Sequence, residues 1–347
     1  MARTRPGYRG GVTTPAPDPT VGELSEGTIL RRILDRLGPS HAVIGPGDDA
    51  AVLIAADGRV VATTDTLVHG PDFRLAWSSA HDIGWKAAAV NLADIAAMGA
   101  RPTALLVALA MPDDTRISFV EGLADGLRAA CDELAPGCAV EGGDLTVSDT
   151  LTIAVTALGS LDGRDPVRRS GARPGEVVAL AGDAGVAALG LDLLFERFTA
   201  ADGAPLPLTA ESFAARVPAP DERTAVARQL RPRPPVPMGA LAASAGATAM
   251  LDVSDGLALD ATRIADASDV TIELFSSALG RDAARALSGG EDHALLATFP
   301  AAVGVPAGFR AIGRVASRGA EAIIVDGAPF RGRGGWDPYR DWDAGLG

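Results

Sequence analysis

The chain has 347 residues, 47% of them hydrophobic and 22% charged, which indicates about two globular domains and excludes wholesale disorder. Its net charge of −13 excludes nucleic-acid binding through a general electrostatic footprint, which needs a basic face. The longest apolar run, residues 103–111, is too short to span a membrane, the first residues lack a signal-peptide core, and the two cysteines make no disulfide framework. We therefore expect a cytoplasmic protein.

Residues 1–20 are rich in Pro, Gly, Arg and Thr without periodicity, and we expect a disordered tail. Hydrophobic periodicity and turn signals then predict helices at 26–37, 80–98 and 115–134, and strands at 51–55, 60–64, 104–110, 139–141 and 151–158. The first two strands are separated by Asp57-Gly58, a hairpin signal. Asp65 would end the second of them, and residues 142–144 would lie between the last two strands.

The polar segment 162–175, punctuated by Gly and Pro, is the expected domain boundary, which divides the chain into 21–162 and 163–347. Beyond it strand and helix patterns alternate, at 177–181, 185–195, 224–230, 239–245, 249–253, 256–267 and 270–275, followed by strands at 294–298, 311–315 and 323–325. Both halves therefore predict an α/β or α+β fold.

Acidic residues recur beside glycines and at strand ends, at Asp48, Asp49, Asp65, Asp144, Asp252, Asp255, Glu291 and Asp292, and Asp94 lies one helical turn after Asn91. Each taken alone is also an ordinary turn or helix-cap residue. If they converge they repel one another, and Lys86 is the only lysine in the chain. A divalent metal is the simplest remedy, and Mg²⁺ favours carboxylates shared with phosphate oxygens. Because the common nucleotide motifs are absent, the residues themselves indicate only a metal-dependent phosphate enzyme.

The motifs in this order resemble the thiamine-monophosphate kinase family, within the superfamily of aminoimidazole-ribonucleotide synthetase and selenophosphate synthetase. The most specific block is Asn-Leu-Ala-Asp-Ile-Ala-Ala-Met-Gly-Ala at 91–100, combined with Ser-Asp-Gly-Leu at 254–257. The resemblance extends from about residue 21 to 339, with further matches at 44–51, 63–68, 86–90, 142–144, 169–171 and 288–292.

This resemblance implies that the chain transfers a phosphoryl group in line from ATP to thiamine monophosphate, without a phosphoenzyme. It implies a homodimer whose N-terminal α/β domains, residues 21–162, pair in a barrel-like sheet and bind ATP and Mg²⁺, while residues 163–347 complete the substrate site. It assigns Mg²⁺ to Asp49, Thr63, Thr64, Asp65, Asp94, Asp144, Asp252 and Asp255, of which Asp94, Asp252 and Asp255 would be catalytic. It assigns ATP to Gly143, Asp144, Arg169 and Ser254, and the thiamine substrate to Asp72, Glu291 and Trp336.

The sequence departs from the family pattern at several positions. Asp72 stands where His commonly contacts substrate, His293 stands where Tyr is frequent, and the stretch 258–288 is shortened. Two other functions therefore stay open: a sister ATP-dependent enzyme with another acceptor, and a non-catalytic protein that binds metal and nucleotide. Trp336 could also be a packing residue, and Arg169 a solvated linker charge.

Overall fold

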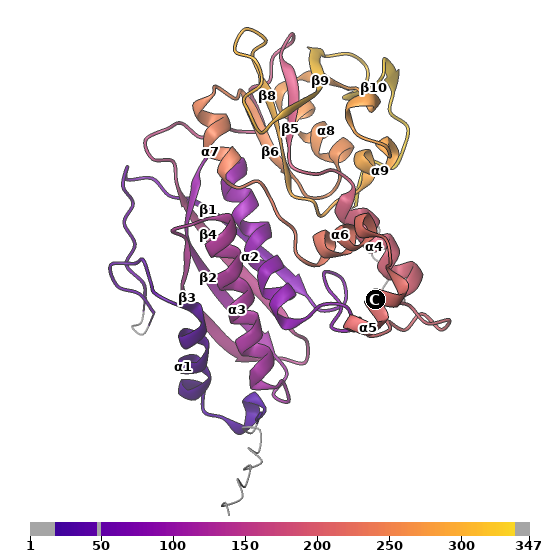
Figure 1. Cartoon of the computed structure of the whole chain (residues 1–347). Helices are drawn as coiled ribbons and strands as arrows, with labels where there is room; N and C mark the ends of the chain where they lie inside the picture. The colour runs from indigo at the N-terminus through magenta and orange to yellow at the C-terminus, as the bar shows by residue number, and fades with distance from the viewer. Residues whose placement is uncertain (1–17, 47–49, 337–347) are drawn as a thin grey trace, which may run out of the picture.

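The computed structural model describes residues 18–46 and 50–336, which fold into two mixed β-sheets of four and seven strands with helices packed against them (Figure 1). The expected α/β class is confirmed. In the part of the chain that is described, the four-stranded sheet is open and closes no barrel. Residues 18–20, placed in the tail by composition, lie against the start of a helix at residue 117, where the Ser118 hydroxyl donates to Asp18.

The four-stranded sheet carries helices on one face. Its strands run in the order β1-β4-β2-β3, with bounds β1 (Val61–Val68), β2 (Arg101–Met111), β3 (Ala139–Val147) and β4 (Thr152–Ser160). The helices of this half are α1 (Glu26–Leu37), α2 (Ala80–Ala97) and α3 (Ile117–Leu134). Ser79 caps the start of α2, where its hydroxyl accepts the Asp82 N–H and the Asp82 carboxylate accepts the Ser79 N–H.

The seven-stranded sheet forms the second half, in the order β11-β10-β7-β9-β5-β8-β6. Its strands are β5 (Val177–Ala181), β6 (Ala249–Val253), β7 (Val270–Leu274), β8 (Ala294–Phe299), β9 (Arg310–Ser317), β10 (Ile323–Val325) and β11 (Ala328–Pro329). The helices are α4 (Val186–Arg197), α5 (Ala210–Arg216), α6 (Pro220–Leu230), α7 (Pro237–Ser244), α8 (Leu257–Ser268) and α9 (Ala283–Ser288). None of the described helices is both long and apolar enough to cross a membrane.

Helix α2 packs against both halves. It contacts β1, β2 and β4 on one side and α7, β6 and β8 on the other. Alanine-rich composition allows this, because small side chains let neighbouring elements approach, and most of the helix is buried. A Cβ on Gly239 of α7 would lie 2.1 Å from the carbonyl oxygen of Ala96. Consequently, residues of β6 and β8 such as Met250 and Phe299 share one hydrophobic cluster with Ile95 of α2.

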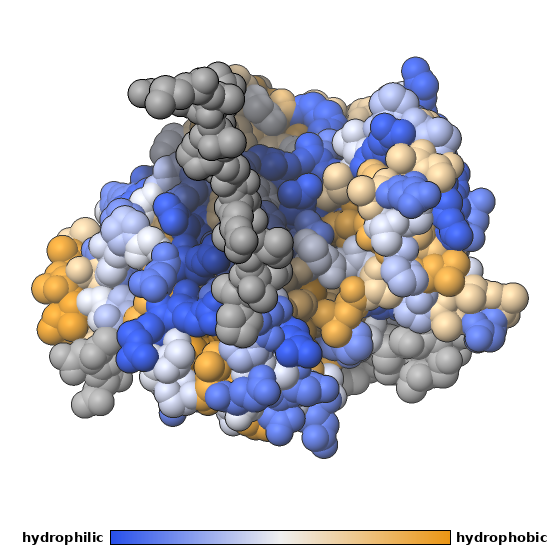
Figure 2. Space-filling view, turned by 60° about the horizontal axis from the view of Figure 1, so that its bottom comes forward, coloured by the Kyte–Doolittle hydropathy of each residue, from blue (hydrophilic) through white to orange (hydrophobic). Residues whose placement is uncertain are grey.

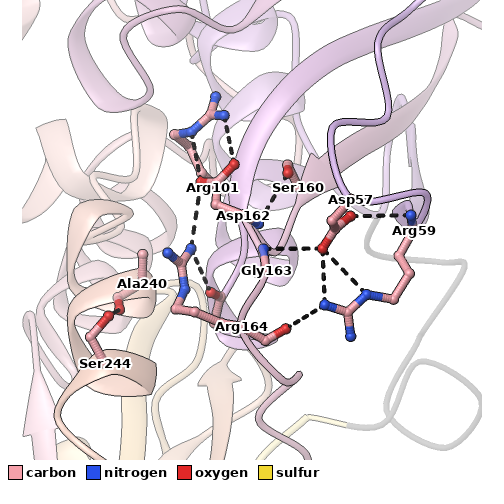
Figure 3. Close-up of polar contacts among 10 residues, drawn as sticks. Asp57, Arg59, Arg101, Ser160, Asp162, Gly163, Arg164, Ala240 and Ser244 are labelled. Carbon is pink, nitrogen blue, oxygen red and sulfur yellow. Dashed lines mark hydrogen bonds and ion pairs between the residues drawn. The ribbon is translucent and has the colours of Figure 1, made fainter.

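The connection between the halves is fixed to the first half by a polar network (Figure 3). The Asp162 carboxylate accepts hydrogen bonds from Arg101 at 3.0 and 3.2 Å. The Gly163 N–H donates to Asp57, and Arg59 donates to the Arg164 carbonyl. These contacts fix the direction in which the chain enters the second half.

Three local predictions are wrong. Asp65 does not end its strand, because β1 continues to Val68 in pairing with β4. Residues 51–55 form no strand, and β1 pairs with β4 rather than with them, while Val52 makes only an isolated bridge to Ile44. Residues 142–144 form no break between strands, because β3 runs through them beside β2. A Cβ on Gly143 would lie 2.1 Å from the Val107 carbonyl oxygen, so the glycine allows β3 to approach β2 closely.

Candidate functional site

Two cavities lie on either side of the C-terminal end of β6. The larger, about 730 Å³, is lined by Ser254 and Asp255, which directly follow β6, and by residues of α2, α4, the loop after β1 and the chain near residue 336. The smaller, about 220 Å³, is lined by Asp252 within β6 together with Thr63, Asp94 and Arg169. Residues from both halves of the chain therefore meet here, although they are far apart in sequence.

Two carboxylates, Asp94 and Asp252, line the smaller cavity, and the charge of a third, Asp65 of β1, acts on Asp94. Because side chains alternate along a strand, Thr63 and Asp65 both face α2. The Thr63 hydroxyl donates to Asp94 at 2.8 Å, and the Asp65 N–H donates to the Asn91 side chain at 3.0 Å. Burial raises the pKa of Asp94 to about 7, helped by the negative charges of Asp252 and Asp65.

These carboxylates fit a magnesium ion only if phosphate or water supplies the rest of its coordination. Among the described residues, no three His, Cys, Asp or Glu side chains form a group that could hold a metal. Mg²⁺ characteristically uses one or two protein carboxylates, completed by substrate phosphates and water. The raised pKa of Asp94 shows that the pocket disfavours a further negative charge, which a cation would relieve.

A row of alternating charges connects the two cavities. Nδ1 of His293 lies 3.1 Å from the Asp252 carboxylate, and Nζ of Lys86 lies 2.6 Å from Glu291. Burial by itself would lower the pKa of His293, but the hydrogen bond to Asp252 and the charges of Asp252 and Glu291 raise it to about 9. The imidazolium and the ammonium thus compensate carboxylates of the site.

Cationic side chains therefore offset part of the repulsion between the carboxylates. Besides the two pairs above, Asp255 accepts a hydrogen bond from Arg263 at 2.6 Å. Arg263 lies in α8, eight residues after Asp255, so the pair falls outside the i,i+3 and i,i+4 spacings by which a sequence indicates helical ion pairs. Glu291 and His293 both have positive φ, 71° and 51°, which places strained backbone beside the charges.

The larger cavity combines aromatic surface with charge. The Arg74 guanidinium lies 4.6 Å from the ring centres of both Trp77 and Phe195. Trp336 also lines this cavity, 42% exposed, and its backbone N–H donates to the Asp255 carbonyl at 2.9 Å. The loop that follows β1 supplies Trp77 and helix α4 supplies Phe195, and together they form an aromatic wall of the cavity. The sequence motifs did not reveal it, because the two residues are about 120 positions apart.

The predicted residues fall into three groups. Around the cavities lie Thr63, Asp65, Asp72, Asp94, Arg169, Asp252, Ser254, Asp255, Glu291 and Trp336. Thr64, Gly143 and Asp144 are elsewhere, since Thr64 faces away from α2 and the other two occupy the exposed edge strand β3, three strand spacings or roughly 14 Å from β1. Asp49 lies outside the described residues.

Asp72 lines the larger cavity, but its carboxylate is partly used within the fold. One oxygen accepts the Val68 N–H at 2.7 Å. The backbone carbonyl of Asp72 accepts a hydrogen bond from Lys86 at 3.2 Å. Burial raises the pKa of this carboxyl group, which the Val68 N–H opposes.

Comparison with known proteins identifies similar chains over almost the whole length. The family model of the AIR synthase related protein, N-terminal domain, matches residues 47–161. A thiamine-monophosphate kinase of Mycobacterium tuberculosis is 42% identical over 342 residues, which cover 94% of this chain and 95% of the relative.

Solved structures agree with that comparison. Thiamine-monophosphate kinase from Stenotrophomonas maltophilia is 34% identical with a TM-score of 0.70, over 88% of this chain and 98% of that one. AaThiL complexed with AMPPCP and TMP is 31% identical with a TM-score of 0.68, over 90% of this chain and 96% of that one.

Proposed function

This chain belongs to the thiamine-monophosphate kinase family, and on that premise we propose that it converts ATP and thiamine monophosphate into ADP and thiamine diphosphate. The observation that carries the assignment of the site is the pair of cavities flanking the end of β6. The smaller receives the ATP phosphates, and the larger receives the acceptor. The reaction takes place in the cytoplasm, where reducing conditions keep Cys131 and Cys138 as thiols.

The transfer is a direct in-line displacement. An oxygen of the acceptor phosphate attacks the γ-phosphorus of ATP, the bond from that phosphorus to the β–γ bridging oxygen breaks, and its electron pair leaves with ADP. The acceptor oxygen is already anionic near neutral pH, so no strong general base is needed. The chain's task is to bring two anions together in the right orientation.

Asp65, Asp94 and Asp252 would hold Mg²⁺ on the donor side, and Asp255 a further ion beside the transferred group. Bound Mg²⁺ supplies neutralisation of the phosphate charges. The support for these positions is the mutual repulsion of the three carboxylates, since the charges of Asp65 and Asp252 both raise the pKa of Asp94. Thr63 orients the Asp94 carboxylate by its hydrogen bond, and Arg169 contributes positive charge for the nucleotide.

The larger cavity suits the thiamine part of the acceptor. Thiamine carries a cationic thiazolium ring and a flat aminopyrimidine ring. Trp336 offers an indole face, and Glu291 offers a carboxylate whose pKa is lowered, because the opposing charges of Lys86 and His293 outweigh its burial. Stacking and charge complementarity therefore select this ring system.

A homodimer completes the proposal. The face of the four-stranded sheet opposite α2 and α3 is exposed and carries small side chains, among them Ala62, Thr64 and Ala108. The nearby segment 43–60 exposes Val43, Ile54 and Val60, and Figure 2 shows hydrophobic surface gathered at its left margin, where this segment lies. Pairing of two such faces would bury this surface and form the barrel-like sheet.

The decisive test is an ADP-release assay with ATP, Mg²⁺ and thiamine monophosphate, in which mass spectrometry identifies the product. Thiamine diphosphate that forms only with Mg²⁺ present is the expected result. Mg·ATP binding without product from thiamine monophosphate would refute the proposed reaction, and leave a sister enzyme or a non-catalytic protein.

A further inference from the structure

Lys86 is the only lysine of the chain, and it lies in the wall of the larger cavity. Its side chain is buried, 6% exposed, in the first half of α2. A buried ammonium group is costly unless it has a partner, so this position requires a specific reason.

The ammonium group has one hydrogen left for a ligand. Of its three donors, one faces Glu291 at 2.6 Å and one donates to the Asp72 carbonyl at 3.2 Å. No third partner occurs among the residues that the structure describes. Because Lys86 lines the cavity, the remaining hydrogen is available to a molecule bound there.

The other cations of this cavity are engaged elsewhere. Arg285 forms ion pairs with Asp192 and Asp282. The guanidinium of Arg74 lies against the rings of Trp77 and Phe195. That of Arg333 donates to the Gly335 carbonyl at 3.3 Å and lies 6.0 Å from the centre of the Trp336 ring. The acidic side chains of the cavity, Asp255 and Glu291 among them, would repel an anionic acceptor, so a positive group is needed to bind one.

Helix α2 also sets the distance between Lys86 and the donor side. Asp94 follows Lys86 by eight residues on the same helix, about 12 Å along its axis. The helix is buried on both sides, and Asn91 between them is fixed by its bond to the Asp65 N–H. One rigid element thus presents a cation to the acceptor cavity and a carboxylate to the donor cavity.

We propose that Lys86 binds the phosphate group of the acceptor through its remaining ammonium hydrogen, held in place by Glu291 and by the carbonyl of Asp72. The inference rests on the proposed function and names the residue that recognises the phosphate group of the acceptor. Asp72 is then a positioning residue, because its carboxylate fixes the turn at Val68 and its carbonyl orients the ammonium.

The test compares two ligands that differ only in the phosphate. Binding of thiamine monophosphate and of thiamine to the full chain is measured by titration calorimetry, with Mg²⁺ and a non-hydrolysable ATP analogue present. In Lys86→Met the dissociation constant for thiamine monophosphate should rise about tenfold or more, while that for thiamine changes less than about twofold. Lys86→Arg should recover part of the loss.

A purely structural role for Lys86 predicts a different pattern. If it only packs against its neighbours, both ligands lose affinity together; if it only neutralises Glu291, the double variant Lys86→Met/Glu291→Gln regains the preference for the phosphorylated ligand. Either result overturns the inference, as does unchanged binding of both. Arg197→Met, which breaks the ion pair to Glu222 away from the cavity, controls for general destabilisation.

The proposed function is tested separately by the wild-type protein. Absence of thiamine diphosphate in the ADP-release assay refutes the reaction, whereas the calorimetric comparison needs only a preference for the phosphate ester. A preference that depends on Lys86 without product would refute the reaction and retain the inference.

Discussion

Asp94 is the residue at which charge and function conflict most directly. Burial and two neighbouring carboxylates raise its pKa to about 7, so its ionised form destabilises the folded protein when no cation is bound. A group retained in such a place contributes something other than stability. The proposed reaction supplies the reason, because the carboxylate charge is needed when magnesium and phosphate enter.

Asp94→Asn separates these two effects. The amide oxygen can still accept the Thr63 hydroxyl, and the unfavourable charge is gone, so the melting temperature should stay the same or rise. Phosphoryl transfer should fall by about 100-fold or more, because an electrostatic contact to the reacting groups is lost. Turnover and thermal denaturation are measured together. Asp266→Asn on the exposed side of α8 is the matched control, and near-normal turnover of Asp94→Asn would contradict the assignment.

Asp292 gives a pH-dependent prediction outside the metal-binding residues. Its carboxylate accepts the N–H groups of Val186 and Ala187 at the start of α4. Burial raises its pKa to about 6, although these N–H groups act in the opposite direction. Since the pKa of the folded state exceeds the unfolded value, this group adds stability below pH ~4, and that contribution is lost as the pH rises through 6.

The unfolding free energy of Asp292→Asn should lack the pH dependence that the Asp292 carboxyl group causes. Relative to the variant, the wild type should lose up to about 1.4 kcal/mol of unfolding free energy per pH unit between pH 4 and 6. Urea denaturation of both proteins across this range measures the difference. If the unfolding free energies of the two proteins changed in parallel with pH, burial would not raise the pKa of Asp292.

At the level of elements, the site depends on a close crossing of α2 and α3. A Cβ on Gly84 would lie 2.0 Å from the Leu123 carbonyl oxygen, and one on Gly126 would lie 2.1 Å from that of His81. The two glycines therefore let the backbones touch at reciprocal positions. This crossing fixes the helix that carries Lys86, Asn91 and Asp94.

Gly126→Ala should push the two helices apart. The added methyl group meets backbone atoms that cannot rotate away, so we expect a loss of about 1–3 kcal/mol in unfolding free energy. Gly27→Ala in α1 is the control, because no atom lies within 4 Å of its Cβ and the better helix former should gain up to about 1 kcal/mol. Chemical denaturation compares them. Equal stability of both variants would contradict the close crossing.

Most helices and strands were predictable because each carries its own periodic pattern, as α2 does between Ser79 and Gly99, whereas the short helices α5 and α9 were not predicted. The residues 51–55 were mispredicted because a hairpin signal is local, whereas the strand that pairs with β1 is β4, about 90 residues later. The carboxylates of the site were predictable from motifs. Their partners were not, since Lys86 and Glu291 come from elements about 200 residues apart.

At the scale of the whole molecule, the proposed site residues lie on both faces of the four-stranded sheet. Thr63 and Asp65 face α2, whereas Thr64 faces the opposite, exposed side. Leu145 packs toward the core, so by alternation its neighbour Asp144 also faces the exposed side. One chain by itself therefore leaves part of the expected ATP site uncovered, and pairing with a second copy would cover it.

Ala108→Arg tests this directly, because the residue is exposed near the middle of β2 on that face. An arginine on each of two apposed sheets introduces like charges that must lose their water, so the variant should be monomeric while the wild type elutes with twice the mass of one chain. Light scattering after size-exclusion chromatography measures this, with Ala201→Arg in the loop after α4 as control. If pairing completes the ATP site, the monomer should also bind ATP more weakly; a dimer that survives the substitution would place the interface elsewhere.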